Sequence, residues 1–294
     1  MIEGMNEKSM KKDYFKYFAG LLLFGSNGII ASHIALSSCE IVFLRSALGS
    51  ILLIVLYLAS GHKFTALAHK KDLLFMTASG ICMAADWLFL FEAFQQMGVS
   101  LSIIINYCGP AIAVAASVIL FKDRMTFSKA VALAAALTGA VLINSFSAGS
   151  KMNAAGLICA LLSALSYAAM VIFNKCSKQN TGTENAVLQL FVTATTVTVY
   201  MGFRYGFHMS VPSDNWPWIL WLSLLNTGIG CYLYFSTISR LPVQTVAVCS
   251  YIEPLSAVLF SLIFLKEEMV PLQWFGGLLI LGGAVYSEYA RFRK

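Results

Sequence analysis

A glutamate stands directly before a proline, as Glu253-Pro254, in an apolar stretch that is long enough to enter a membrane. A buried carboxyl group can bind a proton or the ammonium group of a small molecule, because burial disfavours its charged form. The proline removes one backbone hydrogen bond from a helix, and backbone freed at membrane depth is tolerated where it lines a cavity. We therefore expect Glu253 to bind a proton or a cationic group. The alternative is a structural carboxylate held by an arginine or an amide.

Three further charged side chains fall within apolar stretches, Asp86 and Glu92 in one and Arg45 in another. A charge at the centre of a bilayer costs about 2.5–3.5 kcal/mol on insertion scales, so each needs a reason. Glu92 is expected to be a second acidic site, a gate or the partner of Arg45, which is itself expected to be structural or gating. Asp86 and Glu92 point about 120° apart on a helix and cannot form a carboxylate pair on one face. Asp86 is expected to be structural or to line a cavity, and it is kept with Glu253 and Glu92 as a candidate for substrate binding or proton coupling.

Tyr107 and Tyr251 each stand three residues before a proline, Pro110 or Pro254, and both prolines are expected to shape or gate their helices. Aromatic side chains around an acid suit an ammonium group, because the ring faces attract cations. Other polar and aromatic residues could complete such a cavity, although each could instead pack between helices. These candidates are Asn27, Trp87, Asn106, Tyr167, Tyr232 and Tyr234.

The chain that holds these residues has 294 residues, of which 59% are hydrophobic and 12% charged. A soluble domain carries about twice that share of charge. Apolar stretches of about 20 residues joined by short polar segments predict transmembrane helices. The sequence therefore predicts an all-α membrane protein, with no long soluble segment to hold an aqueous active site. Ten spans are expected, at residues 14–36, 40–60, 72–96, 99–121, 127–146, 153–175, 184–206, 216–238, 243–265 and 271–290.

Positive charge predicts how the chain is oriented. Cytoplasmic loops of membrane proteins are enriched in Lys and Arg, and a cytoplasmic N-terminus places most of the 20 basic residues on that side. We therefore expect both termini, including the tail 1–13, to be cytoplasmic and the protein to lie in the cytoplasmic membrane. The net charge of +6 follows from this asymmetry and does not indicate nucleic acid. The seven cysteines are expected to be core residues, and no metal or cofactor is predicted.

The chain contains an internal repeat. A shift of 144 positions aligns Tyr107 with Tyr251 and Pro110 with Pro254, and Glu40 and Glu184 fall on the same shift. Two units of five spans follow, 14–146 and 153–290, and because five is odd the second unit is expected to be inverted. Inverted repeats are typical of secondary transporters, whose halves exchange conformations about a site near the bilayer midplane. Gly109 stands where the second unit has Glu253, so only one unit has the acid.

Several motifs resemble the EamA branch of the drug/metabolite transporter superfamily. They are the arginine in "VFLRSALGS", the hairpin "LFEAFQQMGVSLSIIINYCGP", its counterpart "YFSTISRLPVQTVAVCSYIEP", and the following "LFKDR" and "FLKEE". The resemblance covers nearly the whole chain. It implies movement of small organic metabolites, often outward transport of amino acids or related compounds, without naming the cargo. The segment "FGSNG" departs from the pattern, since many relatives carry a tryptophan there.

The leading prediction is a secondary transporter that exports a small amino-acid-like or cationic metabolite, with protons as the candidate coupling ion. A facilitative uniporter with a structural Glu253 and an intramembrane enzyme are the alternatives. The sequence has no HExxH or GxSxG motif, which disfavours an enzyme. It also has no ATP-binding motif, so a gradient must supply the energy. Gly276 and Gly283 share one helix face, where they serve either a dimer contact or packing within the chain.

Overall fold

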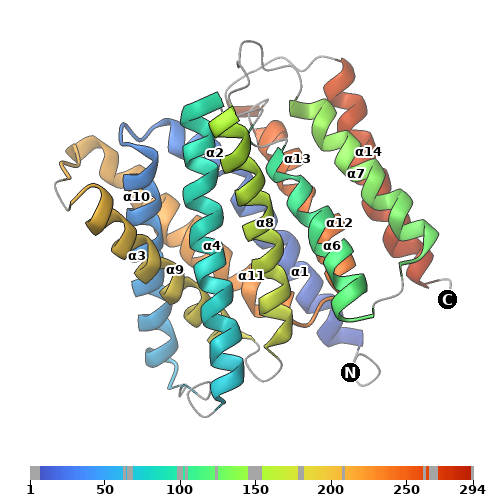
Figure 1. The fold of residues 1–294 in the computed structure, drawn as a ribbon, viewed down its shortest axis with the longest axis horizontal. Helices are drawn as coiled ribbons and strands as arrows, with labels where there is room; N and C mark the ends of the chain where they lie inside the picture. Colours follow the sequence, from blue (N-terminus) through green and yellow to red (C-terminus); the bar gives the residue numbers. More distant parts are fainter. Residues whose placement is uncertain are drawn as a thin grey trace.

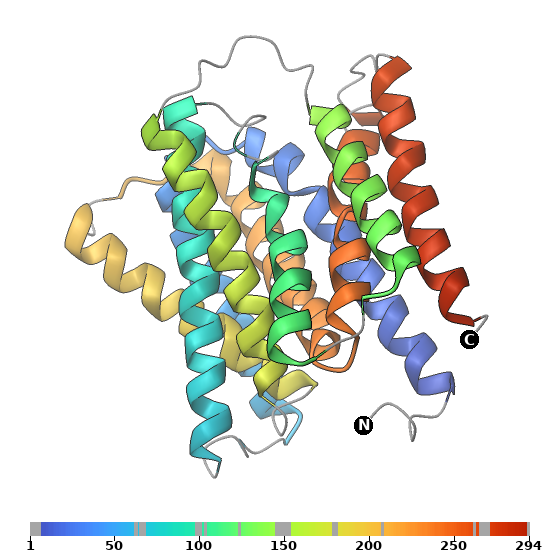
Figure 2. The ribbon, with the colours of Figure 1, turned by 45° about the vertical axis from the view of Figure 1, so that its right-hand side comes forward.

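The described residues form helices joined by turns and loops, with no strand among them, as the sequence predicts. The computed structural model describes residues 7–61, 64, 69–97, 102, 105–122, 125–144, 154–177, 182–206, 209–260, 263–264 and 271–292, and Figures 1 and 2 show them as a bundle. The first half holds α1 (Glu7–Gly25), α2 (Asn27–Ser32), α3 (Ser38–Ala59), α4 (Lys70–Met97), α6 (Cys108–Leu120) and α7 (Phe127–Asn144). The second half holds α8 (Ala154–Cys176), α9 (Thr183–Arg204), η2 (Ser213–Asn215), α10 (Trp216–Leu220), the π-helical η3 (Trp221–Ile229), α11 (Gly230–Ile238), α12 (Val243–Ser250), α13 (Ile252–Phe260) and α14 (Pro271–Phe292).

Five of the described helices are long and apolar enough to cross a membrane. Large apolar side chains face outward from the bundle, and Phe203 on α9 is 91% exposed. Exposure of this kind suits lipid tails, which accept apolar side chains that water would not. The protein is therefore a multi-pass membrane protein, while the count of ten spans stays a prediction. The five are Ser38–Ala59, Lys70–Ala93, Ala154–Cys176, Thr183–Arg204 and Ser213–Ile238; shorter apolar helices cover Cys108–Leu120, Ala130–Gly139 and Trp274–Gly283.

Three of the expected spans are interrupted in the structure. The first changes from α1 to α2 at Ser26, the fourth has a turn at Tyr107 before α6, and the ninth has a turn at Tyr251 between α12 and α13. In the eighth, α10 passes through the π-helical η3 into α11. Interrupted helices leave backbone groups free to bind side chains or ligands. The interruptions are therefore the natural places to look for a site.

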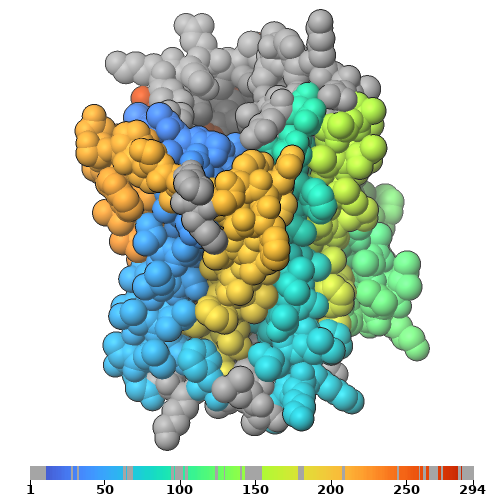
Figure 3. All heavy atoms as spheres, turned by 60° about the vertical axis from the view of Figure 1, so that its left-hand side comes forward, coloured from blue at the N-terminus to red at the C-terminus, as the bar shows by residue number. Residues whose placement is uncertain are grey.

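Helix α9 packs against both α3 and α4 on one face of the bundle, as Figure 3 shows. Helix α4 also packs along α8, and α1 packs against both α11 and α13. This arrangement brings helices from both halves of the chain around α1, α4 and α8. Polar residues buried there have partners from distant parts of the sequence.

Helices α7 and α14 run side by side at one edge of the bundle (Figures 1 and 2). Their backbones approach closely through glycines. A Cβ atom at Gly139 would overlap the Gly276 carbonyl, and one at Gly283 would stand 2.8 Å from the Ala132 carbonyl. Gly276 and Gly283 therefore serve packing within the chain, which answers the alternative that the sequence left open.

Candidate functional site

The helix interruptions at Tyr107 and Tyr251 meet each other inside the bundle. Their backbones have nearly the same shape, with φ −66° and ψ −5° at Tyr107 and φ −68° and ψ −6° at Tyr251. The Tyr251 hydroxyl donates a 2.7 Å hydrogen bond to the Tyr107 carbonyl, and the ring centroids are 6.0 Å apart. Pro110 and Pro254 lie in the first turns of α6 and α13, where a missing N–H costs nothing. Each proline thus starts a new helix, and the break precedes it.

Glu253 lies in the first turn of α13, directly after the break at Tyr251. A negative charge is favourable there, because the N-terminal end of a helix carries partial positive charge. The side chain is partly exposed, and its carboxyl group lies within electrostatic range of Arg45 and Asp86. The backbone here touches α1, since a Cβ at Gly25 would stand 2.9 Å from the Glu253 carbonyl. Glu253 thus lies where two of the interrupted spans, the first and the ninth, meet.

Arg45 reaches across from α3 to the π-helical η3. Its Nε atom donates a 2.9 Å hydrogen bond to Thr227 Oγ1, and its guanidinium lies 4.5 Å from the centroid of the Trp87 ring. The hydroxyl of Thr227 in turn donates to the carbonyl of Leu222, five residues earlier. The structure does not pair Arg45 with Glu92, whose carboxylate accepts a 3.1 Å hydrogen bond from Gln96. Within the described part of the chain, Arg45 thus has a neutral hydroxyl and no carboxylate in direct contact.

Asp86 is held by two neutral donors from other parts of the chain. Ser163 Oγ on α8 donates a 2.6 Å hydrogen bond to Asp86 Oδ1, and Asn106 Nδ2 donates one of 3.0 Å to the same atom. The Asn106 amide also lies 2.6 Å from Ser163 Oγ. Asp86 is 6% exposed. The sequence-based candidates Asp86 and Asn106 therefore form one cluster, to which Ser163 adds a hydroxyl that sequence reasoning did not select.

Tyrosines from four segments surround the Glu253 region. The Tyr167 and Tyr234 hydroxyls are 3.2 Å apart, and the Tyr17 and Tyr234 ring centroids are 5.2 Å apart. The side chains of Tyr17, Tyr107, Tyr167 and Tyr234 all lie within electrostatic range of Glu253. Tyr17 was not among the sequence candidates, because it sits near the end of its expected span. Its hydroxyl donates a 2.9 Å hydrogen bond to the Val246 carbonyl on α12.

Two candidates have other partners. Tyr232 accepts a 3.3 Å hydrogen bond from Lys16, whose ammonium also lies 5.0 Å from the Tyr232 ring centroid. Asn27 accepts a 3.0 Å hydrogen bond from Asn226 Nδ2, which also lies 2.8 Å from the Leu23 carbonyl and 2.7 Å from Ser26 Oγ. These bonds hold the break between α1 and α2. We assign Asn27 to the shape of the first span, and Asn226 is a residue that sequence reasoning missed.

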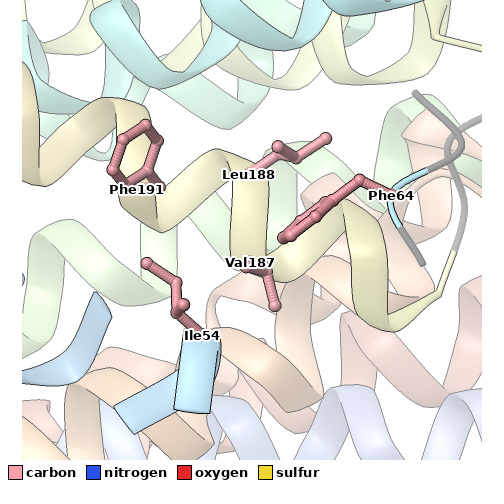
Figure 4. Close-up of a pocket in the computed structure, with 5 residues that line it drawn as sticks. All are labelled: Ile54, Phe64, Val187, Leu188 and Phe191. Carbon is pink, nitrogen blue, oxygen red and sulfur yellow. The ribbon is translucent and has the colours of Figure 1, made fainter. Parts of the chain in front are cut away.

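A separate pocket of about 250 Å³ lies between α3 and α9 (Figure 4). Its lining residues are Ile54, Phe64, Val187, Leu188 and Phe191, all apolar. Such a lining offers nothing to orient a polar ligand. Within the described residues, no group of three or more His, Cys, Asp or Glu side chains could hold a metal ion. Glu253, Asp86 and Arg45 therefore remain the candidate residues for a polar site.

Comparison with known proteins identifies the family. The model of the EamA-like transporter family matches residues 13–145 and again residues 154–288. The chain belongs to this family. A membrane transport function follows from the membership. The two matched segments divide the chain between α7 and α8.

Two relatives from one bacterium carry the same general description. The uncharacterized transporter YxxF of Bacillus subtilis (strain 168) is 23% identical over 99% of this chain and 94% of its own length. The uncharacterized transporter YwfM of the same organism is 24% identical over 76% of this chain and 75% of its own. A crystal structure of another protein superposes with a TM-score of 0.80 at 16% identity, covering 95% of this chain and 98% of that one. That structure shows a shared fold.

Proposed function

We propose that this protein is a secondary transporter that exports a small amino-acid-like or cationic organic metabolite across the cytoplasmic membrane, coupled to protons. The observation that carries the proposal is the position of Glu253. It follows a helix break, has tyrosines around it, and lies within electrostatic range of a buried arginine. A carboxylate within the membrane is costly unless its negative charge is neutralised. In a transporter, a proton or a substrate cation that binds and is then released would neutralise it. A substrate ammonium group fits, because both the carboxylate and the tyrosine rings attract it.

Arg45 adds the opposite charge within electrostatic range of Glu253. Its Nε is engaged by Thr227, so the two terminal nitrogens are the ones available to a ligand. A guanidinium binds a carboxylate with two parallel hydrogen bonds. A zwitterionic amino acid would therefore place its ammonium group at Glu253 and its carboxylate at Arg45. A simple organic cation would use Glu253 and the tyrosines alone.

We propose further that the halves 14–146 and 153–290 are inverted repeats that rock against each other. Some contacts between the halves support this, because adding or subtracting 144 from the residue numbers of one contact gives the residues of another. Gly139 approaches Gly276 and Ile280, and Gly283 approaches Ala132 and Ala136, which is the same pair of contacts with the halves exchanged.

The neighbourhood of Arg45 repeats in the same way. Arg45 forms a hydrogen bond with Thr227. Under the same shift Arg45 corresponds to Gln189 and Thr227 to Met83, and Gln189 Nε2 lies 3.7 Å from the Met83 sulfur. The start of α1 and the end of α14 lie toward the same end of the bundle (Figures 1 and 2), as two cytoplasmic termini require. Such symmetry supports alternating access, in which each half takes up the conformation of the other.

The deciding experiment uses purified protein in proteoliposomes. A panel of radiolabelled amino acids and amines is tested for flux with and without a pH gradient. The proposal expects saturable flux of a cationic or zwitterionic compound that a pH gradient accelerates. Flux that does not change with the pH gradient would indicate a facilitative uniporter. Flux confined to compounds without a positively charged group would exclude the assigned site.

A further inference from the structure

Asp86 differs from Glu253 in its surroundings. It is buried, and both of its hydrogen bonds from described residues, from Ser163 and Asn106, end on the same oxygen, Oδ1. Its other oxygen, Oδ2, is thus left to carry a proton. No ion pair to Asp86 occurs among the described residues. A buried carboxyl group with neutral partners and no cation is stable when protonated, and costs free energy when ionised.

The charges of Asp86 and its charged neighbours do not sum to zero. Glu253 on α13 lies within electrostatic range of both Asp86 and Arg45 on α3. Among the described residues, Asp86 also interacts electrostatically with Tyr167 on α8 and with Cys82 on α4 itself. Two acids and one guanidinium leave one negative charge in excess when all three are ionised. One proton, or one monovalent cation, would restore neutrality.

We propose that Asp86 is the binding site of the coupling proton, while Glu253 binds the positive group of the substrate. The inference rests on the transport function proposed above and divides its two tasks between two acids. A cation that binds at Glu253 adds positive charge near Asp86, so the proton on Asp86 Oδ2 leaves to water. A proton that returns to Asp86 removes the negative charge that attracts the cation. One proton is thus exchanged for one monovalent cation.

Ser163 and Asn106 tune this proton site. Hydrogen-bond donors favour the ionised form of a carboxylate, and a nearby negative charge disfavours it. Loss of the Ser163 hydroxyl should therefore let Asp86 keep its proton to higher pH. Loss of the Glu253 charge should make Asp86 release its proton at lower pH. The two variants move the titration in opposite directions, which a role in packing alone would not produce.

The test observes the proton directly and needs no substrate. Infrared difference spectra of the purified protein in lipid are recorded between steps of pH, following the C=O stretching band of a protonated carboxyl group. The proposal expects a band that disappears as pH rises in the wild type and in the control Glu92→Gln, and that is missing in Asp86→Asn. In Ser163→Ala the band should persist to higher pH, and in Glu253→Gln it should vanish at lower pH.

An unchanged band in Asp86→Asn would overturn the proposal, and so would its complete loss in Glu253→Gln. Circular dichroism and size-exclusion chromatography establish that each variant is folded. If Asp86→Asn does not fold, Ser163→Ala decides, because an unshifted titration there would also overturn the assignment. A proton site found at Asp86 in a protein that moves no compound under a pH gradient would refute the transport proposal and leave the site standing. The two failures are therefore distinguishable.

Discussion

The hydroxyl of Tyr251 donates a 2.7 Å hydrogen bond to the backbone carbonyl of Tyr107, the residue 144 positions earlier in the chain. Both residues interrupt their helices with the same backbone shape. In the inverted repeat proposed above, a contact between equivalent residues lies near the axis that relates the two halves. The reciprocal bond, from the Tyr107 hydroxyl to the Tyr251 carbonyl, is therefore available to the conformation in which the halves have exchanged their roles.

The first prediction compares Tyr251→Phe with Tyr107→Phe. The first substitution removes the donor of the bond seen here, and the second removes the donor of its reciprocal. They should shift the equilibrium between the inward-open and outward-open conformations in opposite directions, each by up to about tenfold, because a hydrogen bond contributes about 0.5–1.5 kcal/mol. Distances between spin labels across the bundle measure these populations. Shifts in the same direction would contradict the reciprocal arrangement.

A second prediction concerns Glu253→Gln, which keeps the shape of the side chain and removes its charge. Folding and expression should be near normal, because no described residue forms an ion pair in direct contact with Glu253. Affinity for cationic and zwitterionic substrates should fall about tenfold or more, since a hydrogen bond to a charged group contributes about 1.5–3 kcal/mol. Neutral compounds should be affected less, and flux driven by a pH gradient should be lost. Transport assays on Glu92→Gln are the control, and equal behaviour of the two variants would make Glu253 structural.

Arg45→Lys provides a third test. Lysine keeps the positive charge but loses the Nε donor to Thr227 and the planar group over Trp87. A zwitterionic substrate should bind more weakly, while the corresponding amine without a carboxylate should bind as before. Thr227→Val removes the same hydrogen bond and leaves the guanidinium in place, so it should weaken zwitterion binding less. Equal losses for the zwitterion and the amine would remove Arg45 from the substrate site.

The fourth prediction uses two glycines of the paired edge helices. A Cβ at Gly139 would overlap the Gly276 carbonyl on α14, whereas one at Gly282 would meet nothing within 4 Å. Gly139→Ala should therefore destabilise the protein by about 1–3 kcal/mol through overpacking. Gly282→Ala should be neutral or stabilise by up to about 1 kcal/mol, because alanine favours the helix. Thermal unfolding in detergent ranks the two, and a reversed order would refute the packing between α7 and α14.

The fifth prediction concerns orientation in the membrane. Asp214 in η2 and Lys71 at the start of α4 are both exposed, and cysteines replace them singly in a protein without its seven native cysteines. A membrane-impermeant thiol reagent should label position 214 in intact cells and position 71 only after permeabilisation. The opposite pattern would reverse the topology, and with it the assignment of export.

The amino-acid sequence by itself determined the class of protein, because the free energy of placing apolar and charged residues in a bilayer depends on composition and length. The sequence also predicted the helix break beside Pro254, but not the break at Ser26 or the π-helical η3. A proline that cannot donate a hydrogen bond fits the first turn of a helix, and Pro110 and Pro254 lie there. The resemblance to the EamA family also came from local motifs.

Only the tertiary structure decided which polar side chains meet. Arg45 bonds Thr227, 182 positions away, and Asp86 bonds Ser163, 77 positions away. The sequence made Glu92 the candidate partner for Arg45, because the two carry opposite charges and lie in neighbouring spans. A hydrogen bond requires two atoms within about 3 Å and in line, and helix rotation and crossing set that distance. Hydropathy and charge predict which residues belong to a span, but not which atoms of two spans come into contact. Only the packed fold shows those contacts.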